Sequence, residues 1–298
     1  MRGSKKILVT GATGNVAGVS IPSLIAAGAD LRALVRDESK AQGLKDEGVE
    51  VVVGDLEKSE TLDAAFSGAD SVFLITPPNP NQVIQAKNGI DAAKRNGSPV
   101  VVRLSAGAYR DTPSVLPRVS VQHTEIDDYL KASSVPHTIL KPHFFIQNTL
   151  MAAQTVASDG LVYMAMKDGK IGMIDVRDVA DVAVEVLTKD GHEGNEYYLT
   201  GPASISFDDV AAALSRSLGK QVSYVNVPVE AARRAMIGMG LPEWMADALG
   251  EYTTAFSEGY GDFTTNDVER LTGNRPRSYE TFASDFVEVF AGPQAQAA

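Results

Sequence analysis

A glycine-containing turn directly after the first apolar segment constrains the fold of this 298-residue chain more than any other feature. Residues 6–10 (Lys-Ile-Leu-Val-Thr) are typical of a short buried strand, and residues 15–28 have apolar side chains at helical spacing. Gly11 and Gly14 lie between these two segments. A strand that turns sharply into a helix needs glycine at the turn, so this junction predicts a β-α unit of an α/β domain.

Strand-like and helix-like segments then alternate for half of the chain. Further strands are expected at residues 31–35, 50–53, 71–75, 99–104 and 137–140, and further helices at 39–47, 62–66, 82–96 and 120–132. Apolar strands separated by helices indicate a parallel sheet that is covered on both faces. The expected fold class is therefore α/β, a Rossmann-type doubly wound parallel sheet with a smaller α-rich C-terminal lobe.

The pattern changes after residue 141. Strands expected at 162–166 and 171–174 flank an Asp-Gly pair, which predicts a β-hairpin. Short strands at 196–199 and 222–225, helices at 178–188 and 207–218, and a mostly helical segment at 229–290 complete the expected elements. We predict a Rossmann domain over residues 5–158, with returning segments around 171–200, and a mostly helical substrate lobe over residues 159–293.

Composition narrows the classes of function. The absence of cysteine excludes disulfides, thiolate metal sites and a cysteine nucleophile, and the four histidines have no metal-ligand spacing. A net charge of −11 disfavours nucleic acid and anionic lipid, and no apolar run approaches the ~18 residues of a membrane span. We expect a cytoplasmic protein with a small-molecule substrate and with no metal, nucleic-acid or membrane partner. The oligomeric state is left open.

The glycine turn is also typical of a dinucleotide-binding site. Free N–H groups and a partial positive charge at the helix N-terminus favour a pyrophosphate there. The residues expected to contact the cofactor are Gly11, Thr13, Gly14, Asn15 and Val16. A nucleotide-hydrolase loop is not expected, because no Gly-Lys-Ser/Thr follows.

The residues after the second strand predict NADP(H) rather than NAD(H). Arg36 offers a planar fork for a 2′-phosphate, and Lys40 offers a second cation. Asp37 instead favours NAD(H), because an acid at this position binds the ribose 2′-hydroxyl of NAD. The alternative for Arg36 and Lys40 is a solvated surface pair.

Two later strand ends are expected to complete the cofactor site. Asp55 would accept a hydrogen bond from the adenine amino group, with Leu56 against the ring; alternatively, Asp55 caps the following segment. Thr76 and Pro77 end the fourth strand, where small rigid residues would border a ribose.

The chain resembles the NmrA-like branch of atypical short-chain dehydrogenases over nearly its whole length. The resemblance rests on the segments at 11–16, 34–37, 54–56, 123–127, 138–145 with Asn148, 174–180 and 198–202. The branch contains NAD(P)H:quinone and dye reductases as well as non-catalytic redox sensors. Lys141 and Asp127 stand where the family usually has Arg and Glu, with the charges kept, and Ala17 replaces the third glycine of the turn.

The proton-donating pair of the wider dehydrogenase family, Tyr-xxx-Lys, is not found where it would work. The one match, Tyr163 with Lys167, falls in the predicted hairpin and is interpreted as a coincidence. On the helix expected at 120–132, Tyr129 is followed four residues later by Ser133. This argues against the usual alcohol-dehydrogenase and sugar-epimerase chemistry.

His123 and Ser105 are the catalytic candidates that remain. Imidazole titrates near neutrality, so His123 is the best resident acid, although a core or helix-surface histidine is the alternative. Ser105 ends the fifth strand and would hydrogen-bond the acceptor or the nicotinamide, unless it only caps a turn.

The segment after the sixth strand should lie near the nicotinamide. Pro142 and Phe144 are expected at the cofactor, and Phe145 and Asn148 at the substrate, with plain core packing as the alternative for the aromatic rings. Trp244, in a methionine-containing part of the C-terminal lobe, would contribute to a flexible apolar surface suited to a flat substrate, or would simply pack between helices.

Three functions follow from these features. The first is an NADPH-dependent oxidoreductase that transfers hydride to a quinone-like, azo or other conjugated acceptor, because such acceptors are electron-poor and need little help from the protein. The alternative is a non-catalytic NAD(P)-binding redox sensor of the NmrA type. A sugar-nucleotide epimerase or reductase is the third, and it would need a tyrosine near the nicotinamide.

Overall fold

A seven-stranded parallel sheet forms the centre of the protein in the computed structural model, which describes residues 5–107, 114 and 116–292. The strand order is β3-β2-β1-β4-β5-β6-β8, and every neighbouring pair is parallel. The strands are β1 (Lys6–Val9), β2 (Asp30–Val35), β3 (Glu50–Val53), β4 (Ser71–Leu74), β5 (Val100–Leu104), β6 (His137–Pro142) and β8 (Glu196–Leu199). The predicted fold class is confirmed, and the segment at 196–199 joins the same sheet as its last strand.

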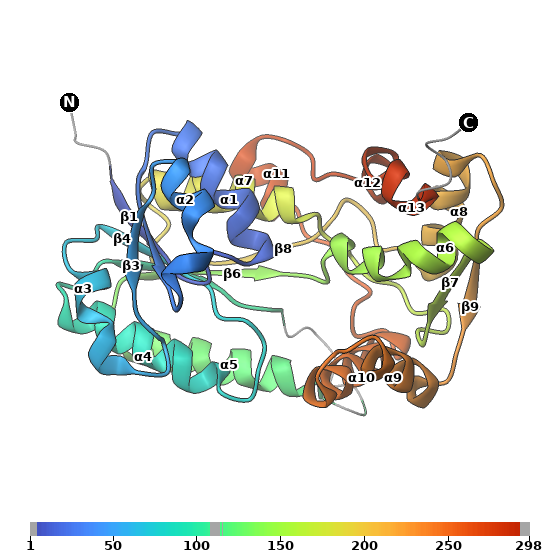
Figure 1. The fold of residues 1–298 in the computed structure, drawn as a ribbon, viewed down its shortest axis with the longest axis horizontal. Coiled ribbons are helices and arrows are strands. Elements are labelled where there is room, and N and C mark those ends of the chain that lie inside the picture. Colours follow the sequence, from blue (N-terminus) through green and yellow to red (C-terminus); the bar gives the residue numbers. More distant parts are fainter. Residues whose placement is uncertain (1–4, 108–113, 115, 293–298) are drawn as a thin grey trace.

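Helices cover both faces of this sheet (Figure 1). One face carries α4 (Gln82–Arg95) and α5 (Arg118–Ala132), and the other carries α1 (Asn15–Ala26), α7 (Val176–Thr188) and α11 (Asp267–Thr272). The short elements at the β2 and β3 edge are η1 (Glu38–Lys40), α2 (Gln42–Asp46), η2 (Ser59–Thr61) and α3 (Asp63–Phe66). The apolar strands are buried because each face of the sheet packs against its own hydrophobic cluster.

The strand order reverses between β1 and β4, and this reversal positions the site. The connections from β1 and from β4 leave in opposite directions, so a crevice opens beyond the carboxyl ends of these two strands. Thr10 fixes the two ends relative to each other, since its buried hydroxyl donates to the carbonyl oxygen of Ile75 and accepts from the Ile75 N–H, each at 2.8 Å.

A second lobe lies to the right of the sheet in Figure 1. It contains η3 (Ile146–Ala152), α6 (Ala153–Asp159), β7 (Leu161–Met164), α8 (Phe207–Leu218), β9 (Ser223–Asn226), α9 (Val229–Gly238), α10 (Glu243–Ser257), α12 (Tyr279–Asp285) and α13 (Val287–Ala291). It has its own buried cluster, which includes Phe207, Phe282 and Phe290. The exact division of the chain near residue 158 stays a prediction.

The predicted hairpin at residues 162–174 is wrong. β7 pairs in parallel with β9, and Ile171 makes only an isolated antiparallel bridge to Ile205. The type I′ hairpin turn that Asp-Gly favours needs positive φ at two successive positions, but here Lys167 alone has it, at +46°. Gly169 has a different role, because a Cβ there would lie 2.5 Å from the Phe256 carbonyl oxygen. The segment after β7 therefore packs against the backbone of α10 and does not form a hairpin.

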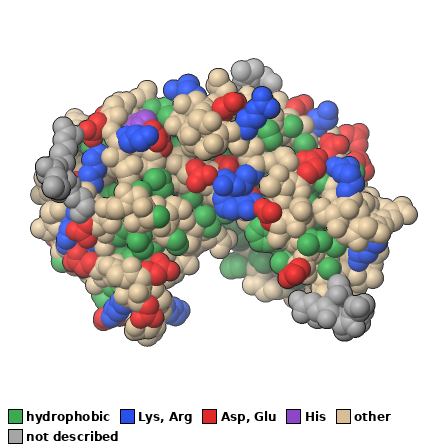
Figure 2. Space-filling view, turned by 90° about the horizontal axis from the view of Figure 1, so that it is seen from above, with side chains coloured by type: hydrophobic (Ala, Val, Ile, Leu, Met, Phe, Trp, Pro, Cys, Tyr) green, Lys and Arg blue, Asp and Glu red, His purple; other side chains and the backbone are tan. Residues whose placement is uncertain are grey.

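The surface seen in Figure 2 is hollowed between the sheet domain and the second lobe, and apolar side chains lie in the hollow. Lys and Arg are interspersed with Asp and Glu on this face, with no single basic patch. In the part of the chain that the structure describes, no helix combines the length and the apolar character needed to cross a membrane.

Candidate cofactor site

A cleft of about 1000 Å³ lies at the carboxyl ends of β1, β2, β3, β4 and β5. Residues at the ends of these five strands line the cleft, together with Gln85 of α4 and Phe145 after β6. The predicted cofactor residues that line it are Gly11, Thr13, Gly14, Asn15, Val16, Arg36, Lys40, Asp55, Leu56, Thr76 and Pro77. Pro142 and Phe144 do not line it.

The glycine turn forms the end of the cleft next to α1. Gly11 has φ +60°, and a Cβ at this position would lie 3.0 Å from the Ile75 carbonyl oxygen, so only glycine fits without strain. The Gly14 N–H donates to the Gly11 carbonyl oxygen at 2.9 Å, and the first i→i+4 bond runs from Gly18 to Gly14. No acidic residue lies in the first turn of α1. The preceding N–H groups of this helix are therefore available to an anion.

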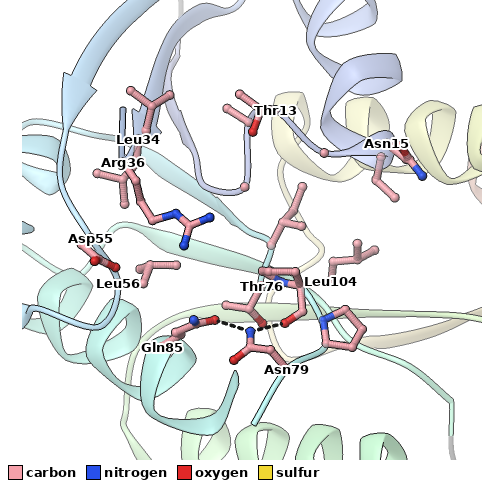
Figure 3. Close-up of a pocket in the computed structure, with 18 of the residues that line it drawn as sticks. Thr13, Asn15, Leu34, Arg36, Asp55, Leu56, Thr76, Asn79, Gln85 and Leu104 are labelled. Carbon is pink, nitrogen blue, oxygen red and sulfur yellow. Dashed lines mark hydrogen bonds between the residues drawn. The ribbon is translucent and has the colours of Figure 1, made fainter. Parts of the chain in front are cut away.

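Two cations extend from the end of β2. Figure 3 shows the Arg36 guanidinium directed into the cleft, with Asp55 and Leu56 at the neighbouring end of β3. Lys40 lines the same region. Within the described residues, neither Arg36 nor Lys40 forms an ion pair, and Glu38 pairs with Lys45 instead. An anion in the cleft would therefore find two cations that no described carboxylate holds in an ion pair, although Asp37, Asp55 and Glu57 line the same cleft.

Each acidic side chain of the cleft already has a protein donor. Oδ1 of Asp37 accepts from the N–H of Ser39 at 3.0 Å and from its hydroxyl at 2.6 Å. Oδ1 of Asp55 accepts from the Glu57 N–H at 3.0 Å, so the capping contact considered for Asp55 is present. Oε1 of Glu57 accepts from Gln85 at 2.8 Å. These bonds restrain the position of each carboxylate and favour its ionised form.

Asn79 and Gln85 are among the residues of the cleft that were not predicted from the sequence. Asn79 donates to the Pro77 carbonyl oxygen at 2.8 Å and to Oε1 of Gln85 at 3.0 Å (Figure 3). These bonds tie the loop after β4 to helix α4. Asparagine within a proline-rich turn was the available signal, but its partner on α4 is set by tertiary structure.

A polar network lies in the protein interior next to the cleft. Asp127 is 3% exposed, pairs with Arg103, accepts from the Ser105 hydroxyl at 2.9 Å, and lies 3.4 Å from Nζ of Lys141. Burial lowers the pKa of Arg103 to about 10, so its guanidinium stays charged at neutral pH. Asp127 is therefore the counter-ion of two cations from β5 and β6.

His123 belongs to this network and does not line the cleft. Its Nδ1 lies 2.9 Å from the Arg103 guanidinium, and its Nε2 lies 3.3 Å from Nε2 of Gln82. Burial, together with the charge of Arg103, holds the pKa of His123 well below its usual value. A neutral, enclosed imidazole is a poor proton donor, so this placement favours the core-histidine alternative. Ser105, 4% exposed and bonded to Asp127, does not line the cleft either.

The residues predicted to contact cofactor or substrate after β6 do not lie together. Phe145 lines the cofactor cleft. Pro142 is buried in β6, and Phe144 packs edge-on against Phe256 with ring centroids 6.0 Å apart. Asn148 lines a separate hollow of about 580 Å³, to which Asn15 also contributes.

The remaining predicted residues lie in the second lobe. Trp244 is on α10, with the Arg118 guanidinium 5.7 Å from its ring centroid, and it does not line the cleft. Tyr163 is on β7 and is 43% exposed, and it is likewise absent from the cleft wall. The latter placement is in line with the interpretation of Tyr163 and Lys167 as a coincidental pair.

Comparison with known proteins places this cleft in a family context. The NmrA-like family matches residues 3–283. The NAD(P)H azoreductase of Xenophilus azovorans is 39% identical over 285 residues, which are 95% of this chain and 99% of that protein.

Two solved structures, each of a reductase with its dinucleotide, share the fold. The NADPH-dependent quinone oxidoreductase of Escherichia coli complexed with NADPH superposes with a TM-score of 0.86 and 28% identity, covering 95% of this chain and 100% of that one. The triphenylmethane reductase of Citrobacter sp. complexed with NADP(H) gives 0.85 and 25%, with the same coverage. The glycine turn, the parallel sheet and the family match agree, and this chain belongs to the NmrA-like family.

Proposed function

We propose that the protein is an NADPH-dependent oxidoreductase that transfers hydride to a quinone-like, azo or other conjugated small-molecule acceptor. The observation that carries the proposal is the pair of cations, Arg36 and Lys40, in a cleft built around a glycine turn. The relatives named as reductases of azo compounds, quinones and triphenylmethane support the acceptor class.

The cleft offers a group for each part of the cofactor. The N-terminal N–H groups of α1 would bind the pyrophosphate, and Arg36 with Lys40 would bind the 2′-phosphate. Leu56 would pack against the adenine, and Thr76 and Pro77 would border a ribose. The bound nicotinamide supplies the hydride, and the protein orients it and excludes water.

Reduction of such an acceptor needs only a binding surface from this chain and a proton. Phe145 supplies an aromatic wall at the cleft, suited to a flat conjugated molecule. Because His123 and Ser105 are buried in the interior network, we assign neither as the proton donor, and the proton is taken from solvent. Reduction of an electron-poor acceptor is compatible with this, whereas reduction of a simple ketone would need a resident acid. The substrate roles of Asn148 and Trp244 stay predictions.

Oxidation of NADPH and NADH, followed at 340 nm with quinones and azo dyes, tests the proposal together with a binding titration. Arg36→Ala removes a charge-assisted phosphate contact, which is equivalent to roughly a ten- to hundredfold loss of NADPH affinity. NADH affinity should be unchanged, because NADH has no 2′-phosphate. Arg275→Ala, whose side chain is 87% exposed, is the matched control and should leave both affinities unchanged.

The sensor alternative predicts a different outcome. Tight NADP(H) binding without oxidation in the presence of any acceptor would contradict the reductase proposal and favour a dinucleotide-binding regulator. Equal loss of NADPH and NADH binding in Arg36→Ala would contradict the assignment of Arg36 to the 2′-phosphate.

A further inference from the structure

Arg36 and Asp37 are adjacent at the end of β2, and they favour different cofactors. An arginine here suits the 2′-phosphate of NADP(H), whereas an acid here accepts from the ribose 2′-hydroxyl of NAD(H). Both residues line the cleft, so residue identity alone does not decide between the two cofactors. The hydrogen bonds that Asp37 already accepts determine whether its carboxylate can also accept from the ribose 2′-hydroxyl of a cofactor.

Ser39 supplies those hydrogen bonds. Its N–H and its hydroxyl both donate to the same oxygen of Asp37, at 3.0 and 2.6 Å, where Asp37 is the N-cap of η1. Asp37 is exposed to solvent, so no packing restrains its side chain. Ser39 does not line the cleft, and it reaches the site only through Asp37.

We infer that Ser39 is a specificity-determining residue, which holds the carboxylate of Asp37 at the start of η1 and thereby favours NADPH over NADH. The inference rests on the proposed use of this cleft for NADP(H). With Asp37 held by Ser39, Arg36 and Lys40 determine the electrostatics at the 2′-position. With Asp37 released, the same carboxylate can accept from a 2′-hydroxyl and oppose a 2′-phosphate.

Ser39→Ala removes the shorter of the two bonds and keeps the backbone bond. A hydrogen bond to a charged group is equivalent to about a tenfold change in an equilibrium constant. We therefore expect the ratio of NADH to NADPH dissociation constants to fall about tenfold, through weaker NADPH binding and tighter NADH binding. Ser39→Thr keeps the hydroxyl and should keep the wild-type ratio.

The controls separate an action through Asp37 from a direct contact. In an Asp37→Ala background, Ser39→Ala should produce no further change in the ratio, because the residue that it restrains is gone. Ser158→Ala removes an exposed hydroxyl on α6 that bonds the Gln154 carbonyl oxygen, and should leave the ratio unchanged. Direct titration of each dinucleotide, by the change in nicotinamide fluorescence, needs no acceptor.

Each result has a defined meaning. A shifted ratio in Ser39→Ala that disappears in the Asp37→Ala background supports the inference. An unchanged ratio in Ser39→Ala, or a shift of equal size in both backgrounds, overturns it while leaving the proposed cofactor site intact. Failure of the wild-type protein to bind either dinucleotide overturns the proposed function, and this inference with it.

Discussion

Replacement of Asp127 by asparagine tests whether the buried network beside the cleft holds the sheet to α5. Arg103 is 1% exposed and Asp127 is 3% exposed, so water cannot solvate the guanidinium if its partner loses its charge. The asparagine side chain would keep the shape of the aspartate and would still accept a hydrogen bond. The substitution would remove the charge that offsets Arg103 and, at 3.4 Å, Lys141.

The expected loss follows from the burial of the pair. Removal of one partner of a buried ion pair leaves an uncompensated charge and destabilises proteins by about 3–5 kcal/mol. Lys141 keeps Glu196 as a partner, so the lower end of this range is expected. The free energy of unfolding can be measured in urea by far-UV circular dichroism.

Asp128→Asn is the matched control, because Asp128 is the next residue on α5 and is exposed. Its stability should stay within about 0.5 kcal/mol of the wild-type protein. If Asp127→Asn is no less stable than Asp128→Asn, the buried pair does not hold the structure together and the reasoning fails.

Two further substitutions test the turn and a buried histidine. Gly11→Ala should destabilise the protein by about 1–2 kcal/mol, because φ is +60° and the added Cβ would lie 3.0 Å from the Ile75 carbonyl oxygen. Gly18→Ala, in open space on α1, should stabilise the protein by up to about 1 kcal/mol. Equal effects of the two substitutions on urea unfolding would contradict this account. Burial lowers the pKa of His143 to about 3, so the folded state binds its proton less readily than the unfolded state and stability falls as the pH drops below about 6.5. Between pH 6.5 and 5, the free energy of unfolding of His143→Phe should therefore fall by about 1.6 kcal/mol less than that of the wild-type protein, and parallel pH profiles would contradict the assignment.

Local sequence signals predicted the parts of the site that depend on local geometry. The glycine turn, the cations after β2 and the small residues after β4 lie at strand ends, and the ends of parallel strands meet at one edge of a sheet. The same holds for the helix predicted at 207–218, which is α8: Ser206 caps its start and Gly219, at φ +63°, ends it. These features need only the neighbouring residues and the parallel order of the strands.

The polar network depended on long-range pairing and was not predicted from the sequence. Arg103, Asp127, Lys141 and Glu196 belong to four elements, and only the sheet order brings them together. His123 looked like a titratable group near a site, but burial, together with the charge of Arg103 from 20 residues away, lowers its pKa and makes it a neutral interior residue. Residue type indicated possible chemistry, and burial determined which chemistry was available.

In the second lobe, the local sequence pattern predicted a hairpin that the structure does not contain. The Asp-Gly pair favours a hairpin in isolation, yet the close approach of the Phe256 backbone at Gly169 and the parallel pairing of β7 with β9 produced another path. Such contacts join residues far apart in the chain, which no local propensity encodes.

Anaerobic stoichiometry of NADPH oxidation and quinone reduction is the most direct test of the central claim. The account predicts that the purified protein oxidises one NADPH for each two-electron reduction of a small quinone, at a rate well above the uncatalysed reaction and faster with NADPH than with NADH. Saturable NADPH binding, with oxidation no faster than in the absence of protein across quinones and azo dyes, would contradict it.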